Sequence, residues 1–108
     1  MPIEKWSDQI VVVHLSDDPQ FTDDLQALEA STPVDVLLDF SAVSFINSSN
    51  LARLLKLRTR MIHADANLVL CNVGTQVQST FLVTSLEKVF HFSDNVPTAL
   101  ATLQMKRA

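Results

Sequence analysis

Apolar residues occur along the chain in short runs that alternate with stretches of helical spacing. The short runs predict strands, because β-branched and continuously apolar segments of this length are typical of sheets. These runs lie at Ile3–Trp6, Ile10–Leu15, Val34–Phe40, Asn67–Cys71 and Val89–Phe92. The first run alternates poorly and is expected at a sheet edge. Val34–Phe40 is the most continuously apolar, which is typical of a central strand covered on both faces.

Between the strands, the spacing of apolar residues predicts amphipathic helices. The four buried stripes are Phe21, Leu25 and Leu28; Leu51, Leu54, Leu55, Arg58, Met61 and Ile62; Val77, Phe81 and Thr84; and Ala99, Leu100 and Leu103. Asp23 and Asp24 fall in the first turn of the first helix, where the helix dipole favours negative charge. Thr32-Pro33 should end that helix, and Asp94-Asn95 followed by Pro97 should begin the last one.

The predicted order is strand, strand, helix, strand, helix, strand, helix, strand, helix. Right-handed crossovers between parallel strands would place helices over the sheet, which predicts an α/β sandwich. At 108 residues, with 47% hydrophobic and 19% charged positions, the chain should form one domain over residues 1–108 with a substantial core. Its apolar runs are too short to span a membrane, and Met1–Glu4 lacks the features of a signal peptide. We therefore expect a cytoplasmic protein.

The charge pattern argues against a nucleic-acid partner. The formal net charge is -4, and the basic residues of the second predicted helix are separated by leucines: Arg53, Lys56, Arg58 and Arg60. They are interpreted as the solvated rim of that helix, since a nucleic-acid surface needs a stronger positive field.

Residues that could hold a metal or a cofactor are sparse. Cys71 is the single cysteine and lies in an apolar run, which favours a buried strand thiol. His14, His63 and His91 are scattered without partners at ligand spacing, so we expect no metal site. Gly74 is the single glycine, so the chain lacks a glycine-rich phosphate loop, and we expect no cofactor.

Catalytic patterns are also weak. The Asp17-Asp18 and Asp23-Asp24 pairs could form an acid–base pair, but loop and helix-cap roles are far more common for such residues. Ser48 or Ser49 could act as a nucleophile only with a base, and no spacing in the sequence places one. We therefore do not expect an enzyme.

One polar stretch stands out, Asn47-Ser48-Ser49-Asn50, directly before the clearest predicted helix. All four are good N-cap residues, yet a helix needs only one. A serine at this place has a second possible use, because unpaired N–H groups and the dipole stabilise a phosphate at a helix N-terminus. The stretch is therefore interpreted as a cap that could also be a modification and partner site.

The segment from Val36 to Leu51 resembles the hallmark of the STAS domain, typified by bacterial anti-sigma factor antagonists. That hallmark is an apolar strand, Asp-aliphatic-Ser, an aromatic–aliphatic pair and then Asp-Ser-Ser/Thr-Gly-Leu. Asp39-Phe40-Ser41, Phe45-Ile46 and Asn47-Ser48-Ser49-Asn50-Leu51 follow it here. The strand Leu68–Val73 and the Ser85–Phe90 region are also similar to the family. The resemblance implies a STAS-like α/β fold, with a four- to five-stranded mixed sheet and four helices.

The resemblance also implies a function. Family members bind a kinase-type anti-sigma factor, an ATPase, and thereby regulate transcription; phosphorylation of the first motif serine, here Ser48, ends that binding. The contact surface would comprise Asn47, Ser48, Ser49, Asn50, Leu51 and Arg53 at the helix start, with Asp17, Asp18 and Phe21 after the second strand. A weak homodimer is a further expectation, without nucleic-acid binding or membrane insertion.

Two departures from the family motif leave an alternative open. Asn47 replaces the motif aspartate and removes a charge beside Ser48, and Asn50 replaces the motif glycine and adds a side chain there. Asparagine tolerates unusual backbone angles, so the turn can survive. The alternative is a STAS subunit that docks in a transporter or a larger signalling complex without being phosphorylated.

Overall fold

The computed structural model describes residues 3–31 and 34–107. These residues form five strands, four α-helices and one short 3-10 helix, in the predicted order. The strands are β1 (Ile3–Lys5), β2 (Ile10–Ser16), β3 (Asp35–Ala42), β4 (Leu68–Cys71) and β5 (His91–Ser93). The helices are α1 (Gln20–Glu29), α2 (Ser48–His63), α3 (Thr75–Val83), η1 (Leu86–Lys88) and α4 (Val96–Arg107).

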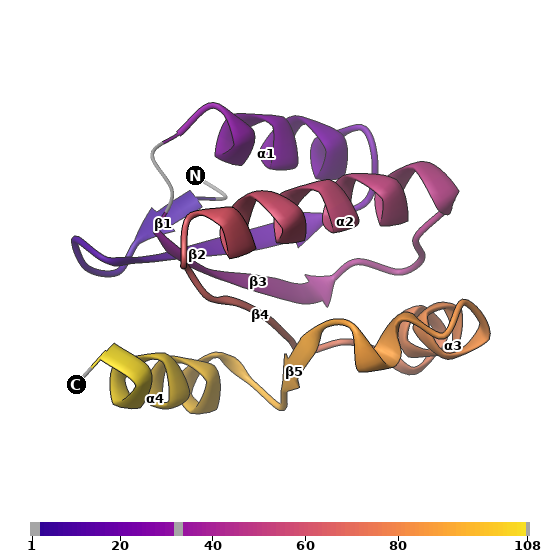
Figure 1. The fold of residues 1–108 in the computed structure, drawn as a ribbon. Coiled ribbons are helices and arrows are strands. Elements are labelled where there is room, and N and C mark those ends of the chain that lie inside the picture. The colour runs from indigo at the N-terminus through magenta and orange to yellow at the C-terminus, as the bar shows by residue number, and fades with distance from the viewer. Residues whose placement is uncertain (1–2, 32–33, 108) are drawn as a thin grey trace.

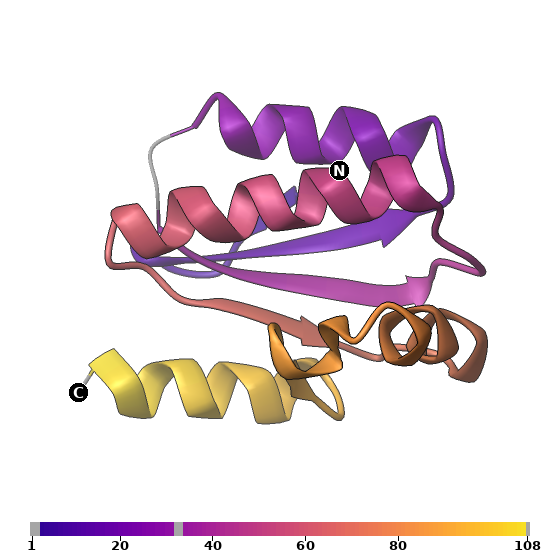
Figure 2. The same cartoon turned by 45° about the vertical axis from the view of Figure 1, so that its right-hand side comes forward.

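The strands form one mixed sheet whose spatial order follows the sequence, β1-β2-β3-β4-β5. β1 is antiparallel to β2 at one edge, and β2 to β5 are all parallel. Because this order never reverses, right-handed crossovers carry α1, α2 and α3 to the same side of the sheet. The helix after the last strand, α4, lies on the opposite side (Figures 1 and 2).

Two apolar clusters hold these layers together, one on each face of the sheet. The larger cluster joins α1, α2 and α3 to the side of β3 that carries Val36, Leu38 and Phe40. The smaller one joins Ala99 and Leu103 of α4 to the side that carries Leu37. The side chains of β3 alternate between the two clusters, so the prediction of a central strand covered on both faces is confirmed.

Edge-to-face aromatic contacts run through the larger cluster. The ring of Phe40 lies 6.1 Å from that of Phe21 and 6.5 Å from that of Phe81, and Phe81 continues to Phe90 at 5.7 Å and Phe92 at 5.2 Å. Aromatic pairs at these separations and angles contribute beyond their buried area. The contacts tie α1, the central strand and the β5 edge into one core.

The strand boundaries differ from the predicted ones by one or two residues. β5 begins at His91 instead of Val89, and Val89 and Phe90 form the link between η1 and the strand. The first helix ends at Glu29, and the predicted stop at Thr32-Pro33 lies outside the described residues. The predicted start of the last helix is confirmed, because the Asn95 side chain accepts a 2.9 Å hydrogen bond from the backbone N–H of Thr98.

The basic residues of α2 differ from the predicted solvated rim. Arg58 Nε donates to the carbonyl of Val89 at 3.0 Å, and Arg60 donates to the carbonyls of Leu28, at 2.7 Å, and Ser31. Lys56 is exposed as expected. The prediction was wrong for the two arginines, because their long side chains reach backbone carbonyls of segments that lie beside α2 only in the folded chain.

Cys71 is fully buried in β4 beneath α4, as the apolar run predicted. Burial raises the pKa of its thiol to about 12, and the charge of Asp39 adds to this effect.

Asp24 differs from the surface role expected for an acidic residue near a helix start. It is buried on the inner side of α1, and its side chain accepts a 2.8 Å hydrogen bond from the Gln20 amide. Within the described ranges, no helix is long and apolar enough to cross a lipid bilayer.

Two leucine substitutions test how the helices are held. Leu54 of α2 is fully buried in the larger cluster, whereas Leu82 of α3 is exposed. We expect Leu54→Ala to lower the free energy of unfolding by about 2–5 kcal/mol, and Leu82→Ala to change it by less than about 0.5 kcal/mol. Urea denaturation followed by circular dichroism measures both, and equal effects would contradict the assigned burial.

Candidate functional site

The start of α2 is closed by a reciprocal pair of asparagines. Asn47 is the N-cap, and its side chain accepts a 2.8 Å hydrogen bond from the N–H of Asn50. The Asn50 side-chain oxygen accepts a 3.0 Å bond from the N–H of Asn47 in return. The two residues that replace the expected aspartate and glycine therefore form a capping box with each other.

The loop between β2 and α1 is tied to this cap. Asp18 accepts a 2.9 Å hydrogen bond from the Asn50 amide, and its other oxygen accepts bonds from the N–H and the hydroxyl of Thr22, at 3.1 and 2.7 Å. Asp17 accepts from the N–H of Ser44 at 2.9 Å and also from its hydroxyl. Both carboxylates thus join the start of α1 to the segment that leads into α2.

These hydrogen bonds stabilise the ionised carboxylates. The pKa of Asp18 is lowered, chiefly by the bond from Asn50 and then by those from Thr22. The pKa of Asp17 is lowered chiefly by the hydroxyl and the N–H of Ser44. A carboxyl whose pKa is lowered on folding contributes stability above its ordinary pKa and loses it as the pH falls through the lowered value. The loop is therefore held at neutral pH and loosens in acid.

The serines of the motif face solvent. Ser48 and Ser49 are the first two residues of α2, and both are exposed. Their backbone N–H groups have no hydrogen-bond partner within residues 3–31 and 34–107, as is usual for a helix start. Phe45, just before them, leaves 54% of its surface exposed. An exposed phenylalanine thus lies beside the exposed serines, and the surface predicted from the sequence did not include it.

The predicted contact residues differ in how far they are exposed. Asp18, Asn47, Ser48 and Ser49 are exposed and Asp17 is half-buried, so these five form one surface at the start of α1 and α2. Arg53 is half-buried and forms an ion pair with Glu29, in which Arg53 Nη1 lies 3.8 Å from Glu29 Oε2. Phe21 is 1% exposed and packs against Phe40, and Asn50 and Leu51 are also buried. These last three side chains shape the surface from beneath.

Little around this surface supports catalysis or metal binding. In the described ranges, the hydroxyls of Ser48 and Ser49 make no hydrogen bond to a histidine or carboxylate, and no group of three or more His, Cys, Asp or Glu could hold a metal ion. An apolar cavity of about 410 Å³ lies beneath the C-terminal halves of α1 and α2, and its lining includes no residue of Asn47–Arg53.

Comparison with known families decides the classification. The sequence profile of the STAS domain matches residues 7–99. The chain belongs to the STAS domain family. The STAS match includes β2 to β5 and the whole candidate surface. No curated protein matches the chain in sequence at a significant level.

Several solved structures share the fold at low sequence identity. A serine-to-glutamate variant of RsbS from Moorella thermoacetica is 18% identical, with a TM-score of 0.81 over 99% of this chain and 97% of that one. An anti-sigma factor antagonist from Mycobacterium paratuberculosis is 22% identical, with a TM-score of 0.79 over 94% and 91%. The anti-sigma factor antagonist SpoIIAA in its unphosphorylated form is 17% identical, with a TM-score of 0.75 over 98% and 96%. The predicted family and fold are confirmed.

The substitution Asn50→Gly tests the link between the cap and the loop. It restores the family's glycine but removes the two side-chain bonds of Asn50, to the N–H of Asn47 and to Asp18, so we expect the free energy of unfolding to fall by about 1–2 kcal/mol. The pKa of Asp18 should rise towards its ordinary value, because its largest stabilising bond is lost. A carbon-13 NMR titration of the carboxyl groups measures this change. Asp17 is the internal control, since Ser44 holds it, and an unchanged pKa of Asp18 would contradict the link.

Proposed function

We propose that residues 1–108 form a single-domain bacterial signalling module related to anti-sigma factor antagonists. It works in the cytoplasm and regulates transcription by binding a kinase-type anti-sigma factor. The contact surface comprises Asp17, Asp18, Asn47, Ser48 and Ser49, with Phe45 beside them. The STAS family and the fold shared with anti-sigma factor antagonists support this proposal.

The observation that carries the proposal is the position of Ser48. It is an exposed hydroxyl at the first residue of a 16-residue helix, and the neighbouring N–H groups of Ser48 and Ser49 are unpaired within the described part of the chain. A phosphate on this hydroxyl could accept hydrogen bonds from such groups and would gain from the helix dipole. The fold can therefore carry the modification without disruption.

The same phosphate would change the surface strongly. It would add about -1.5 to -2 charges next to Asp17 and Asp18. A partner that fits two carboxylates and a neutral serine would then meet a much more negative surface. Phosphorylation should therefore weaken binding by repulsion, since like charges brought together at an interface are costly. This is the basis of a proposed switch at Ser48.

The asparagine cap favours a second candidate function. Asn47 and Asn50 satisfy each other, and Asn50 also holds Asp18, so the turn is rigid without a carboxylate at the motif position. A rigid, unmodified surface suits a constitutive docking subunit of a transporter or a larger signalling complex. Such a subunit would bind its partner in the same way whether or not a kinase is present.

Affinity capture with matched baits distinguishes these functions. Wild-type chain and the variants Ser48→Asp and Ser49→Asp are used as baits in lysate of the source cell, and captured proteins are identified by mass spectrometry. We expect the wild type to capture an ATPase-type kinase. The Ser48→Asp bait should capture at least about tenfold less of that kinase. Ser49→Asp controls for added charge one residue further along the helix and should retain more partner.

Phosphorylation is then tested with the captured kinase and ATP. We expect intact-mass analysis to show one added phosphate on wild type and none on Ser48→Ala, while Ser49→Ala is still modified. Equal capture by wild type and Ser48→Asp, with no phosphate added, would contradict the switch and support constitutive docking. Labelling of Ser48 by a serine-reactive phosphonate would contradict both functions in favour of an enzyme.

A further inference from the structure

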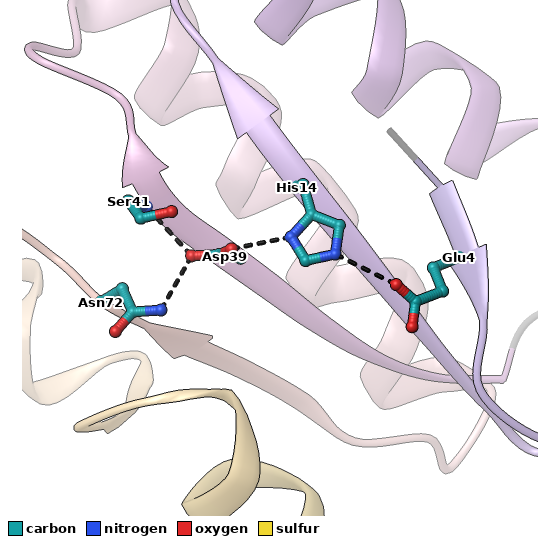
Figure 3. Close-up of polar contacts among 5 residues, drawn as sticks. All are labelled: Glu4, His14, Asp39, Ser41 and Asn72. Carbon is teal, nitrogen blue, oxygen red and sulfur yellow. Dashed lines mark hydrogen bonds and ion pairs between the residues drawn. The ribbon is translucent and has the colours of Figure 1, made fainter. Parts of the chain in front are cut away.

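Three strands are joined by a row of charged side chains on the face of the sheet that α4 covers in part. His14 of β2 lies between Asp39 of β3 and Glu4 of β1 (Figure 3). Its Nδ1 is 2.7 Å from Asp39 Oδ2, and its Nε2 is 3.3 Å from Glu4 Oε1. The carboxylates lie at opposite nitrogens of one ring, so they cannot converge on a metal ion but can share the imidazole.

Asp39 is held rigidly in this row. Its Oδ1 accepts hydrogen bonds from the N–H of Ser41 and from the Asn72 amide, each at 3.0 Å, which leaves Oδ2 directed at the imidazole. The Asp39 side chain is 8% exposed, whereas that of His14 is 44% exposed. The fixed acceptor is thus on the inner side of the ring, and the accessible Nε2 faces the edge strand.

The number of protons on the ring decides what it can bind. A neutral imidazole has one N–H and one lone pair, whereas an imidazolium has two N–H donors. Both neighbours of His14 are carboxylates, which accept hydrogen bonds only. The imidazolium therefore satisfies both contacts, whereas the neutral ring keeps the shorter bond to Asp39 and turns a lone pair towards Glu4.

We propose that Glu4, His14 and Asp39 form a protonation-dependent clamp that holds edge strand β1 against the sheet. Among the described residues, β1 pairs with β2 through three positions, Ile3–Lys5 with Val11–Val13, so one side-chain bond is a large share of what holds this segment. Loss of the proton from Nε2 replaces the Glu4 contact with repulsion and releases the strand.

Other charged groups around the ring do not take over this role. Lys5 of β1 is paired with Asp8 at 3.3 Å, and Asp17, beyond the end of β2, is bound by Ser44. On β4, the Cys71 thiol lies beside Asp39 and stays protonated because its pKa is about 12. Among the described side chains of α4, Lys106 is the one that carries a charge. Within the described ranges it makes no ion pair with Glu4, His14 or Asp39. Among the described residues, Glu4 and Asp39 are therefore the charges that His14 meets.

The direction of the pH effect follows from the two pKa values. The bond to Asp39, followed by that to Glu4, raises the pKa of His14 above its ordinary value despite partial burial. Burial would raise the pKa of Asp39, but hydrogen bonds from Asn72, His14 and Ser41 outweigh it and lower that pKa. Because the pKa of His14 is raised on folding, the stability that its protonated ring contributes is complete below the ordinary pKa of about 6.5. This contribution is lost as the pH rises through the raised pKa. The clamp is therefore closed at mildly acidic pH and opens as the pH rises through the raised pKa of His14.

Hydrogen exchange of the full chain tests the clamp. Protection of the β1 and β2 amides is measured by NMR between pH 6 and 8.5 and corrected for the intrinsic pH dependence of exchange. We expect protection in wild type to fall about two- to tenfold across this range, the change typical of losing one hydrogen bond. His14→Gln should remove the pH dependence, and His91→Gln, at an exposed position of β5, should leave it unchanged.

The substitution Glu4→Gln distinguishes a proton-dependent clamp from simple packing. A side-chain amide can donate to the lone pair of a neutral ring, so this variant should keep the β1 contact at pH 8.5 and lose the fall in protection. Constant protection in wild type across the range would overturn the proposal, as would a fall in His14→Gln equal to that in wild type. A fall in Glu4→Gln equal to that in wild type would also overturn it.

Discussion

The burial of β3 on both faces is the constraint on which the rest of the structure depends. Val36, Leu37, Leu38 and Phe40 are all buried, and their side chains alternate between the cluster under α1 and α2 and the cluster under α4. A strand in this position accepts a polar side chain only where the helices no longer cover the sheet or where neighbouring groups supply hydrogen bonds to that side chain. Asp39 meets this condition through Asn72, His14 and Ser41, and the segment beyond the strand leads out to Ser44, Phe45 and the start of α2. The central strand therefore supplies one partner of the charged row and carries the chain to the candidate contact surface.

The sequence was sufficient to predict the fold because the core is apolar and regularly spaced. The continuous Val34–Phe40 run and the helical spacing from Leu51 to Met61 each follow from local patterns of burial. Cap residues were also readable, since Asn47 and Asn95 lie directly before helices. Element ends were less certain, as at β5, because a 3-10 turn and a short strand use the same apolar residues.

The links within the candidate site and within the charged row could not be predicted, because they join residues far apart in the chain. Asp18 bonds to Asn50 across 32 positions, and His14 bonds to Asp39 across 25. No spacing rule connects such residues until the order of the strands is known. Once β2 and β3 are known to be parallel neighbours, His14 and Asp39 are seen to lie side by side. The same reason explains the arginines of α2, whose acceptors are carbonyls that carry no signature in the sequence. Phe21 shows the opposite limit: the family resemblance predicted contact with a partner, but its side chain at the start of α1 is buried in the core.

The single thiol has a practical consequence. Cys71 is fully buried, and its high pKa leaves almost no thiolate at neutral pH, which is the form that reacts with alkylating agents and oxidants. Removing α4 from the sheet face, or unfolding the whole domain, would expose it. Its rate of alkylation thus reports how often either α4 leaves the sheet or the whole domain unfolds, and the chain carries this probe without any engineered label.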